Sequence, residues 1–216
     1  IKEGKLSFKA DLQIHLFKNK GISLIDVLRA MEENEIDAIG LLYYKWELET
    51  IYSLEEMKRE AKKDYTIEQR GNVLHLKSKA SARKLFIVLG EEAKTTDGFH
   101  ILSIGATNIK LGILREMIKE IRAKGGIVII DHPYADFENS WADIDHRKEK
   151  ILESICQDFQ GKIALEWNGY CNKWARHLTN IAMPEKYTNV NKKVEKFGEK
   201  MEIPVVPTTD LHMKGS

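Results

Sequence analysis

Residues 127–133, IVIIDHP, place a wholly apolar run directly before an aspartate, a histidine and a proline. A short continuous apolar run of this kind is typical of a strand that is buried on both faces, as strands of parallel sheets usually are. Residues 111–124, just before it, have the pattern of an amphipathic helix, and Gly125 and Gly126 provide its C-cap. The stretch therefore predicts a helix followed by a buried strand.

The same alternation runs along the chain on both sides of this stretch. Further strands are predicted at residues 6–14, 37–42, 85–89, 99–104, 163–165 and 205–206. Further helices are predicted from Ser23 to about residue 34, from Ser53 to about residue 62, over about 147–160, and up to about residue 201. Strands alternating with helices favour a parallel sheet covered by helices, and about seven such units predict a closed or nearly closed α/β barrel.

Composition limits the classes of protein to consider. The chain has 216 residues, of which 43% are hydrophobic, so we expect one domain over residues 1–216, with a small hairpin excursion near residues 65–76. Its 34 basic and 33 acidic residues give a formal charge of +1, so it has no strong nucleic-acid signature. Its apolar runs are shorter than the roughly 20 residues of a membrane span, so we expect a cytoplasmic protein without membrane partners. Composition leaves the oligomeric state open.

Ligand-type side chains stand at the ends of the predicted strands. In a βα barrel these ends converge, so residues far apart in sequence gather at one site. The residues concerned are Gln13, His15, Glu92, His132, Asp210 and His212, with His100 at the start of its strand. Histidine, aspartate and glutamate are the ligands of zinc, manganese and iron sites, so a metal site is predicted.

Three other residues have less defined roles. Glu166 follows a predicted buried strand and either lines the same pocket or caps the next helix. Tyr44 belongs to an aromatic group that either stacks on a substrate or, as we prefer, packs a long loop. Glu91 is expected to be exposed, because neighbours in an extended chain point to opposite faces.

These motifs, in this order, resemble those of the polymerase and histidinol phosphatase (PHP) family of metal-dependent phosphoesterases. The segments that carry the resemblance are 13–15 (QIH), 36–40 (IDAIG), 42–44 (LYY), 90–92 (GEE), 99–102 (FHIL), 132–133 (HP) and 209–212 (TDLH). The resemblance covers nearly the whole chain and implies a distorted (β/α)7 TIM-like barrel of the PHP type. The family usually adds another helix after the last motif, so a closing element beyond this sequence is one expectation.

The resemblance also implies ligand sets for divalent metal ions. One metal would be held by Glu92, His100 and His132, and a second by Gln13, His15, Glu92 and Asp210. The second set is weakened, because a neutral amide is a poorer ligand than imidazole. A third set would keep only His212, with Lys20 and Tyr44 where the family has metal ligands. The Lys20 ammonium is a candidate electrostatic substitute for the missing cation.

The implied activity is hydrolysis of a small phosphate ester or nucleotide with one or two Mn, Zn or Fe ions. The cations would activate water and clamp the phosphoryl oxygens, while Asp210 and His212 orient water or protonate the leaving group. The replaced ligands favour an alternative, a degenerate PHP-fold domain that serves as a binding or scaffold module. A metal-dependent amidohydrolase ranks last, because its bridging carbamylated lysine or carboxylate is not identifiable in the sequence.

Overall fold

The computed structural model describes residues 8–16, 23–45, 53–136, 142–168, 190–209 and 211–212, with the backbone alone for 135–136, 142–143 and 211–212. Its strands are β1 Ala10–His15, β2 Ala38–Tyr44, β3 Tyr65–Arg70, β4 Val73–Ser78, β5 Lys84–Lys94, β6 His100–Ile104, β7 Ile127–Asp131, β8 Ala135–Asp136, β9 Ala142–Asp143, β10 Ala164–Asn168, β11 Val205–Thr208 and β12 Leu211–His212. Its helices are α1 Leu24–Glu33, α2 Leu54–Ala61, α3 Leu114–Ala123, α4 His146–Asp158 and α6 Val190–Met201.

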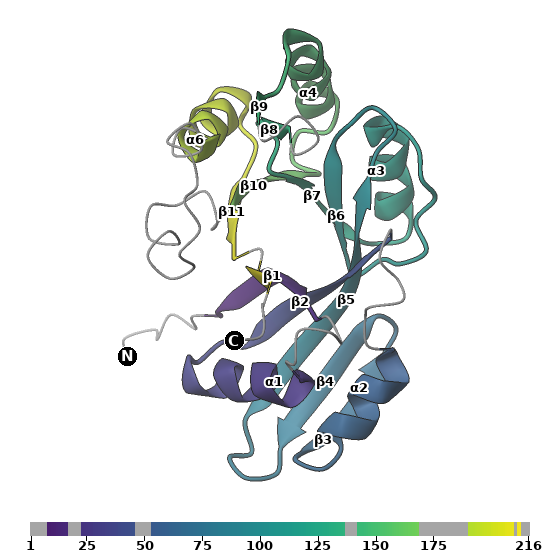
Figure 1. Ribbon diagram of the computed structural model, residues 1–216, viewed down its shortest axis with the longest axis vertical. Coiled ribbons are helices and arrows are strands. Elements are labelled where there is room, and N and C mark those ends of the chain that lie inside the picture. The colour runs from purple at the N-terminus through teal and green to yellow at the C-terminus, as the bar shows by residue number, and fades with distance from the viewer. Residues whose placement is uncertain are drawn as a thin grey trace, which may run out of the picture.

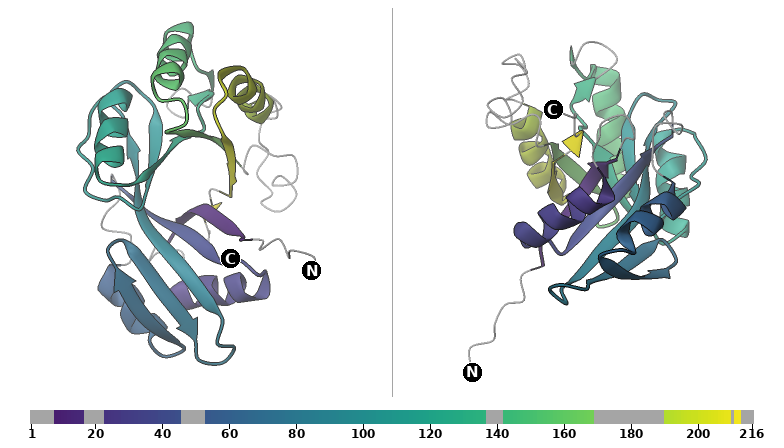
Figure 2. Two further views of the ribbon diagram at one scale, coloured as in Figure 1. Left: turned by 180° about the vertical axis from the view of Figure 1, so that it is seen from behind. Right: turned by 60° about the horizontal axis from the view of Figure 1, so that its bottom comes forward.

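The main sheet curves into a nearly closed barrel. Its strand order is β11-β10-β7-β6-β5-β2-β1-β12, and the hairpin β3–β4 is added alongside β5. In Figure 1 the strands surround a central axis, the helices lie outside them, and the hairpin extends below the ring with one half of β5. Figure 2 shows the ring from behind and, on the right, the molecule turned so that its lower end comes forward. The predicted α/β fold, a distorted TIM-like barrel, is confirmed.

The sheet is not wholly parallel, and this part of the prediction is wrong. β6 is antiparallel to both of its neighbours, β5 and β7. The cause is the short connection between β5 and β6, in which the Thr95 N–H donates to the Phe99 carbonyl at 2.8 Å. A tight turn joins antiparallel strands, whereas a parallel pair needs a crossover of a dozen or more residues.

Alternating side chains divide the buried residues between the outside and the inside of the barrel. One outer cluster packs β1, β2, β4 and β5 against α1 and α2, and another packs β6, β7 and β10 against α3, α4 and α6. A smaller cluster lies on the opposite, inner face of the strands and contains Leu42, Leu102, Ile104, Ile129 and Ala164. Asp131 lies two residues after Ile129 on β7 and therefore points to the same inner face.

Two glycines permit the close approach of backbone inside this barrel. A Cβ atom at Gly40 would lie 2.3 Å from the carbonyl oxygen of Leu12, and one at Gly90 would lie 2.1 Å from that of Ser103. Neither contact can be relieved by moving a flexible side chain, because the opposing atom belongs to the backbone. Glycine at these positions therefore allows the backbone of a neighbouring strand to approach more closely than a side chain would permit.

The helix starts follow from local capping. Ser23 and Asp26 form a complete capping box on α1, and Ser53 and Glu56 form another on α2, as their spacing predicts. Within the described residues, no helix is long and apolar enough to cross a membrane.

Candidate metal centre at the strand ends

The carboxyl ends of β5 and β7 meet the amino end of β6 at one edge of the sheet. His100 pairs in register with Lys94 on one side and with Asp131 on the other. On the next strands, Tyr44 pairs with Glu92. The register therefore brings residues from several strands to one end of the barrel, before any side-chain contact is considered.

Four side chains at this end form a group that could hold a metal ion. Glu92, His100, Asp131 and His132 each offer one ligand atom, and these atoms all lie within 4.8 Å of one another. His100 is partly buried and the other three are buried. Two carboxylates and two imidazoles are the donors that zinc, manganese and iron accept, so the residues fit a divalent cation. A cation would also balance the two negative charges, whose burial is otherwise costly.

Glu92 lies at the centre of these contacts and uses both carboxylate oxygens. Oε1 is 3.2 Å from Nδ1 of His100, and Oε2 is 3.1 Å from Nε2 of His15. Burial raises the pKa of Glu92, but the hydrogen bonds and charges of His100 and His15 outweigh it and hold that pKa well below its ordinary value. The Glu92 side chain is therefore a carboxylate, the form that binds metals, with one oxygen facing each histidine.

His15 is oriented by a second hydrogen bond on the far side of its ring. Its Nδ1 lies 3.1 Å from the carbonyl oxygen of Leu42. A carbonyl can only accept, so Nδ1 carries a proton and Nε2 faces Glu92. Metal-binding histidines commonly have such a partner on the second nitrogen. The ring of Tyr44 stacks on that of His15, with centroids 4.1 Å apart and planes 7° from parallel. Tyr44 thus supports the imidazole by packing.

Gln13 occupies the space between the two carboxylates. Its Nε2 lies 3.4 Å from Oε2 of Glu92 and 3.5 Å from Oδ2 of Asp131, and its amide oxygen lies 3.0 Å from the hydroxyl oxygen of Thr208. An amide nitrogen is a hydrogen-bond donor and has no lone pair for a metal. In this orientation Gln13 crosslinks the two acids and does not ligate.

Glu166 is buried next to the four-residue group and contacts it through the backbone of His132. It is fully buried, and its carboxylate accepts from the backbone N–H of His132 at 2.8 Å, from Nδ2 of Asn168 at 3.2 Å and from the hydroxyl of Thr208. These contacts place Glu166 beside the group, whereas the segment after Asn168, where a helix cap would lie, is outside the described residues.

The contact between Glu166 and His132 bears on backbone strain. His132 has a φ of 28°, a conformation that residues other than glycine rarely adopt. Such strain persists only where the surroundings enforce it, and it concentrates at functional sites. The Glu166 carboxylate is one such restraint here, because it accepts the N–H of the strained residue. This hydrogen bond thereby helps to position the His132 imidazole, whose Nε2 lies 3.1 Å from Oδ2 of Asp131.

The sequence-predicted residues thus divide into those that the structure brings together and those outside its description. Glu92, His100 and His132 come together, with His15 and Gln13 beside Glu92. Lys20 and Asp210 lie outside the described residues. The backbone of His212 pairs with that of His15 through β12, and its side chain is outside the description.

Sequence reasoning missed one member of the group and misplaced one neighbour. Asp131 directly precedes His132 at the end of an apolar strand, so the strand-end rule that selected His132 applies equally to it. Glu91 was expected to be exposed and is buried, with 8% of its surface accessible. It accepts the backbone N–H groups of Asn108 at 2.6 Å and Ile109 at 3.0 Å. Glu91 therefore anchors the segment that follows β6, a long-range contact that strand periodicity does not reveal.

The fold defines a class, the nearly closed α/β barrel, and comparison with solved structures finds the same fold in PHP-like proteins. Over 95% of its length, the chain matches a two-domain protein from Bacteroides vulgatus that contains a predicted PHP-like metal-dependent phosphoesterase, with a TM-score of 0.56 and 14% identity. It spans 52% of that protein, about half of its length.

A second similar structure is a predicted metal-dependent phosphoesterase from Bifidobacterium adolescentis. The match covers 97% of this chain and 90% of that one, with a TM-score of 0.55 and 9% identity. No family model and no curated protein matches the sequence. At such identities the likeness establishes the fold.

Proposed function

We propose that this chain is a metal-dependent hydrolase of a small phosphate ester or nucleotide. One divalent cation, manganese, zinc or iron, is held by Glu92, His100, Asp131 and His132. The observation that carries the proposal is the convergence of these four ligand atoms within 4.8 Å in the barrel end. The two similar structures support it, since both are predicted metal-dependent phosphoesterases.

The residues of the chain have separable tasks in this function. When bound, a divalent cation polarises a phosphoryl oxygen and activates water as a nucleophile. Glu92 and Asp131 supply the negative charge that retains the cation, and His15 keeps Glu92 ionised from the opposite side. Asp210 and His212 remain the predicted groups for orienting water and protonating the leaving group.

The test is hydrolysis of para-nitrophenyl phosphate, bis-para-nitrophenyl phosphate and a nucleotide panel by the purified protein. Metal is removed with a chelator, and manganese, zinc or ferrous iron is added back. We expect activity only with added metal, and at least a 100-fold loss in Glu92→Gln, because even second-sphere changes cost about 10–100-fold. Glu116→Gln, on the exposed side of α3, is the matched control and keeps full activity. Metal-loaded protein that cleaves none of these esters would contradict the hydrolase function.

One observation favours a second candidate function, a PHP-fold binding or scaffold domain without catalysis. Gln13 already crosslinks Glu92 and Asp131, so the protein partly satisfies these carboxylates without a cation. A ligand that binds only the folded state raises thermal stability in proportion to its affinity and concentration. A melting temperature that is unchanged by all three metals would therefore favour the scaffold.

A further inference from the structure

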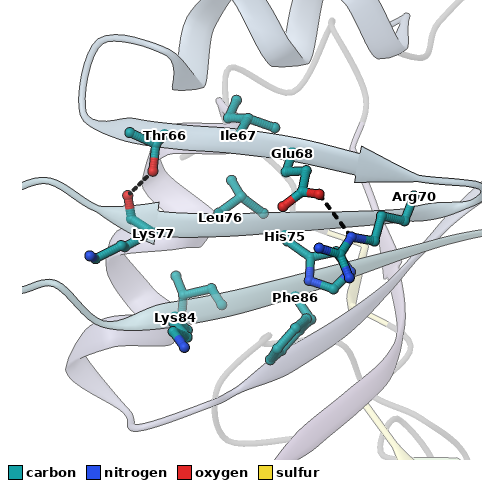
Figure 3. A pocket seen from close by; sticks show the side chains of 10 residues that line it. Thr66, Ile67, Glu68, Arg70, His75, Leu76, Lys77, Lys84 and Phe86 are labelled. Carbon is teal, nitrogen blue, oxygen red and sulfur yellow. Dashed lines mark hydrogen bonds and ion pairs between the residues drawn. The ribbon is translucent and has the colours of Figure 1, made fainter.

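The hairpin β3–β4 and the amino half of β5 form a three-stranded antiparallel sheet with one open face. Leu74, Leu76, Leu85 and Ile87 point to the helix-covered side and pack in the cluster against α1 and α2. The alternate residues therefore point to the opposite, open face, and in register they form the rows Thr66–Lys77–Lys84 and Glu68–His75–Phe86. Figure 3 shows these side chains around a pocket of about 560 Å³ on this open face.

Three rings form a continuous aromatic platform along this face. The ring of Phe86 lies 5.1 Å from that of His75 in an edge contact and 6.4 Å from that of Phe8. Phe8 is 65% exposed. A single exposed aromatic side chain is ordinary, but here three rings lie next to one another, and two of them, Phe86 and His75, line the pocket.

Two lysines lie beside the platform, on the row next to that of Glu68, His75 and Phe86. Lys77 and Lys84 are exposed and stand directly opposite each other on β4 and β5. Like charges at paired positions destabilise a sheet. In the described part of the chain, neither lysine has an acidic partner, whereas Arg70 is paired with Glu68 at 2.8 Å. The pair is thus a local cationic site that the balanced net charge of +1 conceals.

We propose that this face binds single-stranded nucleic acid, with bases stacking on Phe8, Phe86 and His75 and a phosphate lying between Lys77 and Lys84. Aromatic platforms flanked by cations are the chemistry by which proteins hold unpaired strands. Each ring offers a base a flat partner, and the anionic backbone removes the repulsion between the two lysines. The same two lysines would repel a second copy of this face. The face lies at the end of β5 opposite Glu92, so the inference is independent of the metal centre.

The test is fluorescence anisotropy of the whole chain with labelled oligothymidine and oligouridine of about 12 nucleotides, which is within the range such platforms cover. We expect both strands to bind at low salt. Phe8→Ala should weaken binding by about tenfold, because stacking contributes strongly for each base. Lys77→Gln with Lys84→Gln should lower the slope of log affinity against log salt by about 0.7, the value for one lost phosphate contact on a single strand.

The controls distinguish binding at this face from the general effect of removing positive charge. Lys119→Gln with Lys192→Gln removes the same charge from exposed positions on α3 and α6 and should leave the slope unchanged. An equal fall in this control, or no effect of Phe8→Ala, would overturn the proposal. Displacement by polyglutamate as effective as by unlabelled oligothymidine would also overturn it, since the face would then be a docking site for acidic proteins. Every substituted side chain is exposed, so folding is preserved, and circular dichroism checks this.

Discussion

Glu92 faces two sides of the barrel end, and the two sides offer a cation very different groups. On the side of β6 and β7, His100, Asp131 and His132 present ligand atoms that converge with its own. On the side of β1, Nε2 of His15 lies 3.1 Å from the same carboxylate, and the side-chain amide of Gln13 donates to it. Tyr44 stacks on His15 from β2. Gln13 and Tyr44, at positions where the resemblance would place metal ligands, form these specific contacts. We call the side of β6 and β7, with His100, Asp131 and His132, the complete side, and the side of β1 and β2, with Gln13, His15 and Tyr44, the altered side. We expect the complete side to bind metal with Glu92 alone.

The largest expected effect comes from breaking the complete side. Asp131→Asn removes a ligand charge and leaves the shape of the side chain almost unchanged. We expect the affinity for manganese to fall by more than 100-fold, beyond the about 10–100-fold cost of second-sphere changes. Isothermal titration calorimetry measures it, with Asp64→Asn at an exposed position as the control. Equal affinity in the two variants would remove Asp131 from the ligand set.

A somewhat smaller effect is expected from Glu166, which acts on the complete side through His132. Glu166→Ala takes an acceptor from the His132 N–H, from Asn168 and from Thr208. Loss of a buried partner costs about 1–3 kcal/mol, so we expect the free energy of unfolding to fall by about 3 kcal/mol in total. Metal affinity should fall by about 10–100-fold.

Glu166→Gln retains one carbonyl acceptor and should recover part of both losses. Urea unfolding and metal titration separate the two effects. A variant that is destabilised but binds metal normally would show that Glu166 serves the fold alone and does not position His132.

Introducing a metal ligand at position 13, on the altered side, should raise the metal affinity. Gln13→His replaces an amide donor with an imidazole nitrogen that faces Glu92 and Asp131. Because imidazole is a true metal ligand, we expect metal affinity to rise by about tenfold. Gln13→Leu is the control and should bring no gain. If both variants bound metal equally, the space beside Gln13 would not be a metal position.

The smallest effect should come from the stacked ring on the altered side. Tyr44→Leu keeps the site apolar but removes the contact with His15, and such aromatic contacts contribute about 1 kcal/mol. We expect a loss of about that size in urea unfolding and less than a tenfold change in metal affinity. A loss of metal binding as large as that of Asp131→Asn would mean that Tyr44 ligates.

Local rules recovered much of the fold from the sequence. The capping boxes at Ser23 and Ser53 and the apolar run before Asp131 each depend on residues a few positions apart, and the structure contains all three features. The direction of β6 depends instead on how a short turn and the returning segment pack against β5. Periodicity contains no information on strand direction, so the parallel expectation failed there.

The site was predictable to the extent that strand ends converge. That rule brings Glu92, His100 and His132 together, and it holds for Asp131 as well. It could not show that Gln13 lies between two carboxylates or that Glu166 holds the N–H of His132, because these contacts join strands far apart in sequence. The burial of Glu91 follows from a similar long-range contact.

The most direct test of the central claim is the metal content of the purified protein. The wild type and Glu92→Gln are incubated with manganese, zinc or iron, desalted and analysed by elemental mass spectrometry. The account predicts at least one equivalent of one metal in the wild type and none in the variant. No retained metal in the wild type, or the same content in both proteins, would contradict the metal centre.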